Sequence, residues 1–471
     1  MKTLTVTLKQ HTPLIHFQHD QYGATLRASE VKPKLDKFIL TKLGENEGYE
    51  KGCNIAKNKG WLVGKGEHDA LNYKIKIVCT GDIETMFINK KKYYSQNHEQ
   101  DRKPFIVENG KKYLAKVREG GRRIIELQPY PLFFGNINKD INDSNEYRKM
   151  VYTKDVIELQ LNVLNDGLYD YIEENKTILS DFFLNHNFGT RQSKGFGSFY
   201  VKEGTEYYKE PDTKYKFALE GIKKEEYRKL YDAIDLFYKA LRSGINVNGF
   251  YFKSLSFMYA KDVLKAHWDK RMIKEHFYNN IDKRRKDSLI LHINNHGEKE
   301  PLAYVSKIGY DVRDLLGFST TERWTSFKDD IEKKVSICDN GKFRFPEENE
   351  KLLVDRMSSP ILIKPVWQDG KYQVYLILRD DVVDLNKFKA QKYICVLSSK
   401  EKDSKEKDSR KSNKRFMLEI PSDFTTERFF EYIFKTLKFD IKSHVESKYH
   451  SNGNFKLLEE IFNDIKRNLT P

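Results

Sequence analysis

An α+β fold is predicted for this chain by two patterns of apolar residues. In some short stretches apolar and polar residues alternate, which is typical of half-buried strands. In others apolar residues recur every three or four positions, which is typical of amphipathic helices. Between residues 1 and 205 these stretches follow one another as strand, helix, strand, strand, helix, strand. That order is the ferredoxin-like (RRM-like) βαββαβ unit, so we predict such a domain over residues 1–205.

The first four elements of this unit are each supported by a local pattern. Leucine and valine alternate with threonine over residues 3–8, which predicts a strand. A helix is expected next, with Ser29 as its cap and an apolar face over residues 35–39. Residues 72–80 and 156–164 alternate in the same way as the first strand and predict the two middle strands.

The last two elements and an insertion complete the domain. Leu168, Ile172, Leu179, Phe182 and Phe183 share one helix face and predict a single helix. The final strand is expected where FGSFYVK follows a glycine-rich stretch. Between the two middle strands the chain is polar and rich in lysine, and we expect one extra hairpin there, near residues 122–136.

The second half, residues 206–471, has fewer clear patterns. Expected strands are KYKFALEGI, SSPILIKPV and YQVYLILR, the last two joined by the turn WQDGK. A long helix is expected over residues 225–244, with Gly244 near its end, and helix again from Thr425 onward. Residues 398–415 are of low complexity and mixed charge, and we expect a disordered loop inside a hairpin.

The chain is strongly basic. It has 84 Lys and Arg against 69 Asp and Glu, which gives a net charge of +15. Such an excess suits a polyanionic partner, because each neutralised phosphate releases counterions. A lysine-rich proteome would give the same surplus, so charge alone leaves both possibilities open.

Cysteine use and hydropathy exclude several classes of protein. The four cysteines lie far apart without a CxxC pair, so neither a zinc ribbon nor a disulfide framework is indicated. The N-terminus alternates instead of forming the apolar core of a signal peptide. No apolar run approaches the roughly 20 residues of a membrane span. We expect a reduced, cytoplasmic protein without a cofactor.

The stretch NHNFGTRQSKGFGSFYV, residues 185–201, is rich in glycine and carries two cations. A Walker loop is excluded, because the stretch leaves a helix and enters a strand, and Phe196 follows the last glycine of the expected span instead of lysine. The stretch resembles the RNP1 pattern, but Ser198 replaces an aromatic residue. The stretch is then either an ordinary tight turn or a close backbone contact to RNA or to a neighbouring subunit. The cations Arg191 and Lys194 suit phosphate, but the sequence does not decide between the last two.

Three segments of the chain together resemble the RAMP superfamily of CRISPR-associated proteins. They are TPLIHFQHDQYGATLRASEVKPKLDKFI (12–39), FGTRQSKGFGSF (188–199) and DRMSSPILIKPV (355–366). The first is similar to the strand, loop and basic helix of that family, the second to its glycine-rich loop, and the third to a motif late in its chains. Within the superfamily the chain is most similar to subunit one of the type III-B Cmr complex.

This resemblance implies a fold and a role. It implies two tandem ferredoxin-like domains with insertions, the second over residues 206–471. It further implies a non-catalytic, RNA-binding subunit that caps the backbone near the 3′ end of the guide RNA and helps to capture target RNA in antiviral defence. The expected partners are guide RNA, target RNA and other RAMP subunits, with no membrane.

By position the resemblance also implies RNA-binding residues. Those of the basic helix and its start are Arg27, Ser29, Lys32 and Lys34. Those of the glycine-rich loop are Gly189, Arg191, Lys194, Gly195 and Gly197, and Arg356 belongs to the third motif. For Lys32 and Lys34 an ordinary solvated helix face is an equally good interpretation.

Histidines near the first strand leave an alternative open. Some RAMP relatives cut CRISPR repeat RNA with a histidine in this region, where imidazole can deprotonate a 2′-hydroxyl. His11, His16 and His19 lie there, with Asp20 beside them. The ordinary interpretation is that these side chains pack and form hydrogen bonds within the loop. The histidine spacing could also hold a metal ion, but without cysteine partners it is weak evidence for one. The alternative function is therefore a stand-alone endonuclease, although we expect no enzyme.

Overall fold

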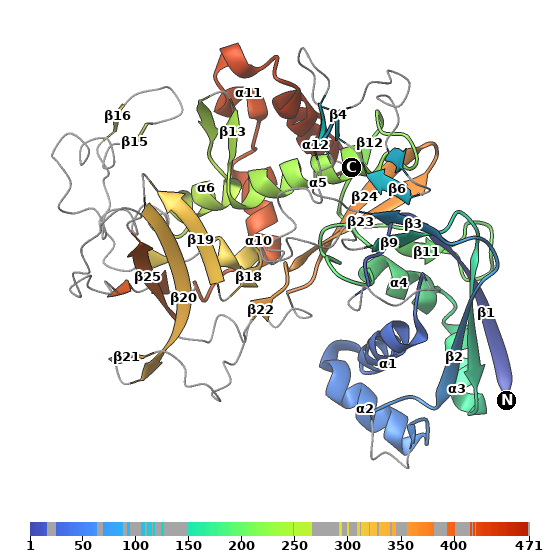
Figure 1. Ribbon diagram of the computed structural model, residues 1–471. Helices are drawn as coiled ribbons and strands as arrows, with labels where there is room; N and C mark the ends of the chain where they lie inside the picture. The colour runs from blue at the N-terminus through green and yellow to red at the C-terminus, as the bar shows by residue number, and fades with distance from the viewer. Residues whose placement is uncertain are drawn as a thin grey trace. The chain divides into compact units, whose positions relative to one another are not determined.

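The computed structural model describes residues 1–16, 25–63, 69–87, 149–247, 249–265, 312–319, 356–380 and 421–469. In four other regions it describes only the backbone of individual strands. These regions are 92–126, 292–310, 321–344 and 393–419. The chain forms two compact units (Figure 1). Unit 1 comprises Met1–Asp235, Leu362–Ile377 and Arg467–Pro471, and unit 2 comprises Leu236–Ile361 and Leu378–Lys466. Because each unit combines distant stretches of the chain, this division does not test the predicted domain boundary at residue 205, which stays a prediction.

A four-stranded antiparallel sheet forms the centre of unit 1. Its strands are β1 (Lys2–Gln10), β2 (Tyr73–Cys79), β10 (Ile157–Val163) and β11 (Phe199–Val201), in the order β11-β1-β10-β2. Leu4 pairs with Leu161 and Val6 with Leu159, so the apolar residues of both central strands share one face. The alternation that predicted these strands is therefore the alternation of a sheet with one buried face.

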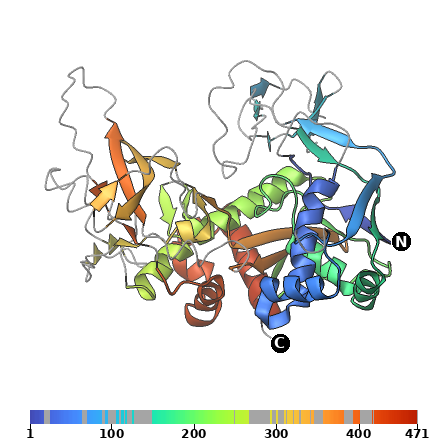
Figure 2. The same ribbon diagram turned by 90° about the horizontal axis from the view of Figure 1, so that it is seen from below.

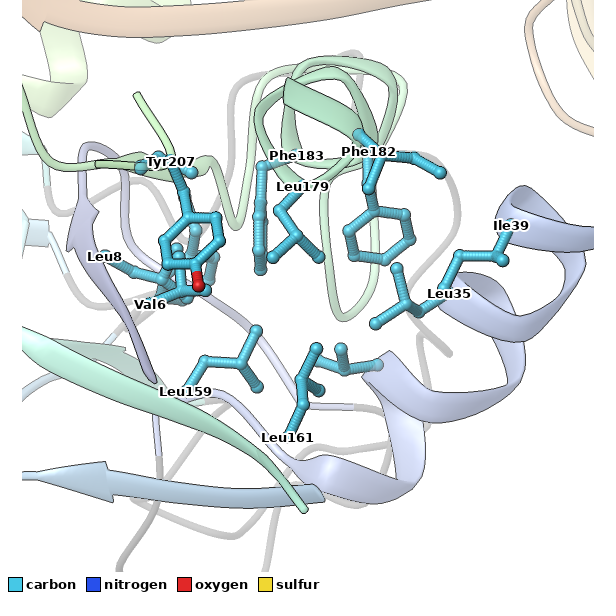
Figure 3. Close-up of a cluster of buried hydrophobic side chains, with 14 of the residues drawn as sticks. Val6, Leu8, Leu35, Ile39, Leu159, Leu161, Leu179, Phe182, Phe183 and Tyr207 are labelled. Atoms are coloured by element: carbon cyan, nitrogen blue, oxygen red, sulfur yellow. The ribbon is translucent and has the colours of Figure 1, made fainter. Parts of the chain in front are cut away.

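Helices cover that apolar face. They are α1 (Ala28–Leu43), α2 (Gly48–Asn58), α3 (Asp166–Glu174) and α4 (Thr177–Asn185). In Figure 1, α1, α2 and α4 lie to the left of β1 and β2. Figure 3 shows side chains of α1 and α4 meeting those of β1 and β10 in one core. Burying one such aliphatic or aromatic side chain contributes about 1.5–3 kcal/mol, so this layer supplies much of the stability of unit 1.

A three-stranded sheet brings a late part of the chain into unit 1. It contains β12 (Tyr215–Leu219), β24 (Lys371–Leu378) and β23 (Ile361–Gln368), in the order β12-β24-β23. The turn between β23 and β24 places Asp369 and Gly370 at φ angles of 50° and 75°, as a tight hairpin requires. All three strands and the turn were predicted. Side chains of β23 and β24 join the same core as β1: Leu362, Val366, Tyr375 and Ile377.

Further strands of unit 1 lie between β2 and β10 in sequence, and Figure 2 shows this part of the chain from below. β3 (Glu84–Phe87) pairs with β9 (Lys149–Tyr152) and with β6 (Lys111–Leu114), which pairs with β5 (Phe105–Glu108). β8 (Ile124–Glu126) pairs with β4 (Lys92–Tyr94) and β7 (Lys116–Val117). The predicted extra hairpin near residues 122–136 includes β8, and its other residues lie outside the described part of the chain.

Unit 2 packs helices around aromatic side chains. α5 (Tyr227–Arg242), which begins in unit 1, is followed by β13 (Ile245–Val247), β14 (Phe250–Phe252) and α6 (Leu255–Asp262). Near the end come α10 (Thr426–Glu431), a π-helical turn (Tyr432–Thr436), α11 (Ile441–His444) and α12 (Gly453–Leu469). The ring of Phe462 lies 5.6 Å from that of Phe237 and 4.7 Å from that of Phe439. The predicted helices over residues 225–244 and after Thr425 are confirmed.

Unit 2 also contains several small sheets. β19 (Thr321–Ser326), β20 (Asp329–Asp339), β25 (Tyr393–Lys400) and β26 (Arg415–Phe416) form one, with β21 (Lys342–Arg344) paired to β20. The other pairs are β15 (His292–Ile293) with β16 (Lys299–Glu300), β17 (Gly309–Tyr310) with β27 (Leu418–Glu419), and β18 (Phe318–Ser319) with β22 (Arg356–Met357). These confirm a mixed α+β fold, whereas a second ferredoxin-like domain is not confirmed.

Three local predictions need correction or comment. The single helix expected around Leu168–Phe183 is two helices, because the chain leaves the helical conformation at Asn175, where ψ is 50°. Ser29 does not cap α1: the helix starts two residues earlier than predicted, at Ala28, with Arg27 at the cap position and no capping side chain. Residues 398–400 and 415 belong to the paired strands β25 and β26, and the residues between them lie outside the described part of the chain.

Candidate nucleic-acid interface

The glycine-rich stretch forms a tight loop between α4 and β11 in unit 1. Gly189, Gly195 and Gly197 have φ angles of 73°, 83° and 62°. Glycine adopts this left-handed conformation without strain, whereas other residues do so at a cost of about 1 kcal/mol or more. Arg191 also has a positive φ, of 62°. A strained arginine at the tip of a loop is an outlier of the kind that clusters at functional sites.

The glycines are needed for close packing within the chain. A Cβ atom on Gly189 would lie 2.4 Å from the carbonyl oxygen of Ile15, and one on Gly197 would lie 2.1 Å from that of Phe188. At Gly195 a Cβ atom would meet Pro365 at 3.0 Å. The backbone at these glycines therefore approaches its own chain, and no ligand is needed to explain them.

The loop divides into a buried part and an accessible tip. Residues 195–198 are buried, and the ring of Phe196 stacks on that of Tyr231 at 3.8 Å between centroids. Phe196 and Phe199 are fully buried, so neither can stack on a base as RNP1 aromatics do. Residues 190–194, which include Arg191 and Lys194, are partly exposed. This tip is the part of the loop that a nucleic acid can reach.

Hydrogen bonds to the segment after β1 hold the loop on one side. The hydroxyl of Thr12 donates to the carbonyl of Gly195 at 2.7 Å and accepts from the N–H of Ser198 at 2.9 Å. The N–H of Thr190 donates to the carbonyl of Ile15 at 2.7 Å. The first and second of the three sequence motifs thus meet directly.

Strand β23 holds the loop on another side. The side-chain amide of Asn187 donates to the carbonyl of Ile363 at 2.9 Å, and the hydroxyl of Ser198 donates to the carbonyl of Pro365 at 2.7 Å. The N–H of Ile363 donates to the carbonyl of Ser193 at 3.3 Å. The later half of the third motif therefore frames the loop as well, although more than 160 residues separate the two in sequence.

Lys364 joins the two ends of the loop and was missed in the sequence. Its buried amine donates to the carbonyls of His186 at 2.9 Å and Phe199 at 2.7 Å. Burial, together with the nearby charge of Lys34, lowers the pKa of Lys364 far below its usual range. A lysine inside the apolar run ILIKPV was the available signal, because a buried amine needs dedicated acceptors.

Two lysines of the basic helix have partners within the chain. Lys34 donates to the carbonyl of Asn187 at 3.1 Å and to the side chain of Gln192 at 2.8 Å. Lys32 donates to Asp36 at 2.6 Å, and burial lowers the pKa of Lys32 and raises that of Asp36. Both lysines are partly buried, so they are not an ordinary solvated face. Their role in RNA binding stays a prediction.

The remaining predicted residues lie elsewhere. Arg27 is partly exposed and Ser29 exposed, both at the start of α1. Arg356 lies in β22, where its backbone pairs with Ser319 in unit 2, and it is not among the residues that frame the loop. The structure thus brings Lys34 against the predicted residues of the glycine-rich loop, whereas Arg27 and Ser29 lie at the start of α1 and Arg356 belongs to unit 2.

His16 faces a carboxylate beside the loop. Its Nδ1 lies 3.7 Å from Glu30, whose other oxygen accepts from the N–H of Gly189 at 3.1 Å. Burial tends to raise the pKa of Glu30, but His16 and Gly189 outweigh it, so the pKa of Glu30 is lowered. His16 is 5% exposed. His19 and Asp20 lie outside the described residues.

Known protein families resemble the chain over nearly its whole length. A family model described as the Cmr1 N-terminal domain matches residues 1–245, and one described as the Cmr1 C-terminal domain matches residues 251–467. The chain belongs to the Cmr1 family. This confirms the resemblance to RAMP proteins of the type III-B Cmr complex. As a member of this family, the chain is a subunit of that complex and assembles with other Cmr proteins.

Individual proteins add little to the family match. Among curated proteins none matches the chain. The crystal structure of Cmr6 from Pyrococcus furiosus resembles part of it, with 13% sequence identity and a TM-score of 0.18, over 43% of this chain and 98% of that chain. A likeness of this degree carries no conclusion about fold or function.

Two kinds of feature are absent from the described residues. Within them no helix is both long enough and apolar enough to cross a membrane. Within the same residues no group of three or more histidines, cysteines or carboxylates could hold a metal ion.

Proposed function

We propose that this Cmr1-family subunit is a non-catalytic RNA-binding protein that caps the backbone near the 3′ end of the guide RNA and helps to capture target RNA. Family membership supports a place in the complex. The observation that carries the RNA-binding part is the tip of the glycine-rich loop, where Arg191 and Lys194 are partly exposed above a buried frame.

The frame makes the tip suitable for contacting phosphate. Both ends of the loop are held by Lys364, and its middle by Thr12 and Asn187, so the tip loses little conformational freedom on binding. Cations on a preorganised backbone position a nucleic acid strand without reading its sequence. That is the recognition that a subunit needs when base pairing with the guide supplies specificity.

The test is the binding of single-stranded RNA by the double variant Arg191→Ala with Lys194→Ala. For single strands, each neutralised phosphate contributes about 0.7 to the slope of log affinity against log salt. Loss of two contacts should lower that slope by about 1.4 and weaken binding at low salt. Fluorescence anisotropy over a range of salt concentrations measures both quantities.

Two further variants make the result specific. Arg191→Gly removes the cation and also the strain of the positive φ, so this variant should fold at least as well as the wild type. Weaker RNA binding by this variant would therefore come from the lost charge and not from a folding defect. Lys223→Ala with Lys224→Ala removes two exposed lysines elsewhere in unit 1 and should leave the slope nearly unchanged. An unaltered slope in both loop variants would contradict the loop as an RNA contact.

The alternative, an endonuclease that processes repeat RNA, would need an accessible histidine. His16 is ordered by Glu30 but almost fully buried, which favours a packing role. Metal-independent cleavage of a repeat hairpin by the purified chain, abolished by His16→Ala or His19→Ala, would overturn the non-catalytic proposal.

A further inference from the structure

The central sheet of unit 1 has a second face that its helices leave uncovered. Alternate residues of β1, β10 and β2 point away from the apolar core, since neighbours along a strand face opposite sides. The register places them in rows across the sheet: Thr3, Asn162 and Lys74; Thr5, Gln160 and Lys76; Thr7, Glu158 and Val78. We call these nine residues, together with Lys9, the open face.

The open face is polar and accessible. Thr3, Thr5, Lys9, Lys74 and Lys76 are exposed, and its other members are partly exposed. Val78 is its only apolar member and none is aromatic. Tyr200 of β11, the register partner of Lys9, lies on the same side of the sheet, but it is only 2% exposed and its ring contacts that of Tyr208, so it is not part of the open face. An ordinary protein-docking surface is built around apolar and aromatic anchors, so this composition does not favour a protein partner.

The charge on the open face is positive. Lys9, Lys74 and Lys76 stand against one carboxylate, that of Glu158. Among the residues that the structure describes, none of these three lysines forms an ion pair, whereas Lys2 at the sheet's end pairs with Asp166 and Asp170. Threonine hydroxyls and the amides of Gln160 and Asn162 lie between them and add neutral hydrogen-bonding groups to the surface.

The spacing of these groups suits an extended polyanion. Lys74 and Lys76 are two residues apart on an edge strand, which separates their backbones by about 7 Å along the strand. Within each row, residues on neighbouring strands lie about 5 Å apart across the sheet. Such a regular array of cations and hydroxyls can follow a sugar-phosphate backbone, but without aromatic platforms it cannot stack bases.

We propose that the open face is a second, sequence-independent binding surface for the phosphate backbone of single-stranded RNA, separate from the tip of the glycine-rich loop. This inference rests on the proposed function of the chain in RNA binding. It assigns the sheet a role opposite to that of an RRM, whose sheet reads bases through aromatic residues. Contacts to the open face therefore lengthen the RNA footprint and do not add sequence preference.

The test uses the full chain with Lys74→Gln and Lys76→Gln, and fluorescently labelled single-stranded RNA of two unrelated sequences. Loss of two phosphate contacts should lower the salt slope by about 1.4, which corresponds to about a 25-fold loss of affinity at 0.1 M salt relative to 1 M. Both RNA sequences should lose affinity equally. The matched control, Lys223→Gln with Lys224→Gln, removes the same charge from exposed positions of unit 1 outside the sheet.

The outcomes separate this inference from the proposed function. A wild-type slope in the sheet variant, while the Arg191 and Lys194 variant loses slope, overturns the open face alone. If the sheet variant and the Arg191 and Lys194 variant both keep the wild-type salt slope, RNA binding is overturned at the open face and at the loop tip. Unchanged RNA binding with lost assembly into the Cmr complex would identify the open face as a protein interface and also overturn the inference.

Crosslinking gives a second readout that does not depend on folding of a variant. RNA that carries 4-thiouridine at several positions is irradiated with the wild-type chain, and crosslinked peptides are mapped by mass spectrometry. Peptides from β2 or β10 should carry RNA adducts that an excess of unlabelled RNA removes. Adducts confined to other parts of the chain would contradict the proposal.

Discussion

At the scale of single residues, His11 is held neutral at the end of β1. Its Nδ1 accepts a hydrogen bond from the N–H of Trp367 at 3.0 Å, which needs an unprotonated ring nitrogen. Burial, and then the charges of Lys364, Lys9 and Lys224, lower the pKa of His11 to about 3. The hydrogen bond therefore joins the residue that follows β1 to Trp367 near the end of β23 only while the imidazole stays neutral.

This predicts a loss of stability in mild acid. The unfolded chain gains a proton on His11 below pH 6.5, whereas the folded chain does so only near pH 3. Stability from this group is complete above pH 6.5 and is lost as the pH falls, by about 2 kcal/mol from pH 6.5 to 5. Urea unfolding at pH 7, 6 and 5 measures the effect.

The variant His11→Asn keeps an acceptor near the N–H of Trp367 but does not titrate. It should be less stable than wild type at pH 7, because a smaller side chain leaves space in the core. Its stability should fall less than that of wild type between pH 6.5 and 5. An equal fall in both proteins would assign the acid sensitivity to other groups.

At the scale of elements, the glycine-rich loop depends on two kinds of glycine. Gly197 combines a φ of 62° with a neighbouring carbonyl that a Cβ atom would meet at 2.1 Å. Gly204 has a φ of 75° but open space around it. We expect Gly204→Ala to cost about 1 kcal/mol from backbone strain alone, and Gly197→Ala about 3 kcal/mol, because the clash adds to that strain.

Thermal unfolding of both variants checks this difference, and RNA binding of the folded fraction adds a second reading. Gly197→Ala should also weaken RNA binding through displacement of the tip, whereas Gly204→Ala should not. Equal destabilisation of the two variants would show that the loop relaxes around the new methyl group.

The elements themselves were largely predictable, but their contacts were not. Alternation over residues 3–8 and 156–164 reflects one buried face, which is a local property of a strand. The break at Asn175 was missed, because apolar residues on both sides of it continue the helical period. The carbonyls of Ile15 and Phe188 that require Gly189 and Gly197 come from the folded chain, and no local pattern indicates them.

The candidate site was predictable to a similar degree. The loop and the third motif were found from composition and resemblance, and the structure places the loop against β23, which contains the later half of that motif. Lys32 and Lys34 were expected to face RNA or solvent, but Asp36, Asn187 and Gln192 bind them. Such pairings depend on which side chains the fold brings within about 3 Å, and sequence spacing does not encode that distance.

At the scale of the whole molecule, unit 1 is assembled from distant parts of the chain. The segment Leu362–Ile377 belongs to it, and β24 pairs with β12 across more than 150 residues of sequence. β23 supplies Leu362 and Val366 to the core around β1 and supplies Lys364 to the glycine-rich loop. A fragment that ends before β12 therefore lacks core side chains and leaves loop carbonyls without their donor.

We accordingly expect the fragment 1–205, which has the boundaries of the predicted N-terminal domain, not to fold on its own. Domains are stable by only about 5–15 kcal/mol, and each large side chain lost from a core removes about 2–5 kcal/mol. Circular dichroism and urea unfolding of the purified fragment, compared with the full chain, decide the matter. A cooperative transition in the fragment would establish residues 1–205 as an independent domain, and its absence would show that the sheet around β1 needs residues beyond 205 in order to fold.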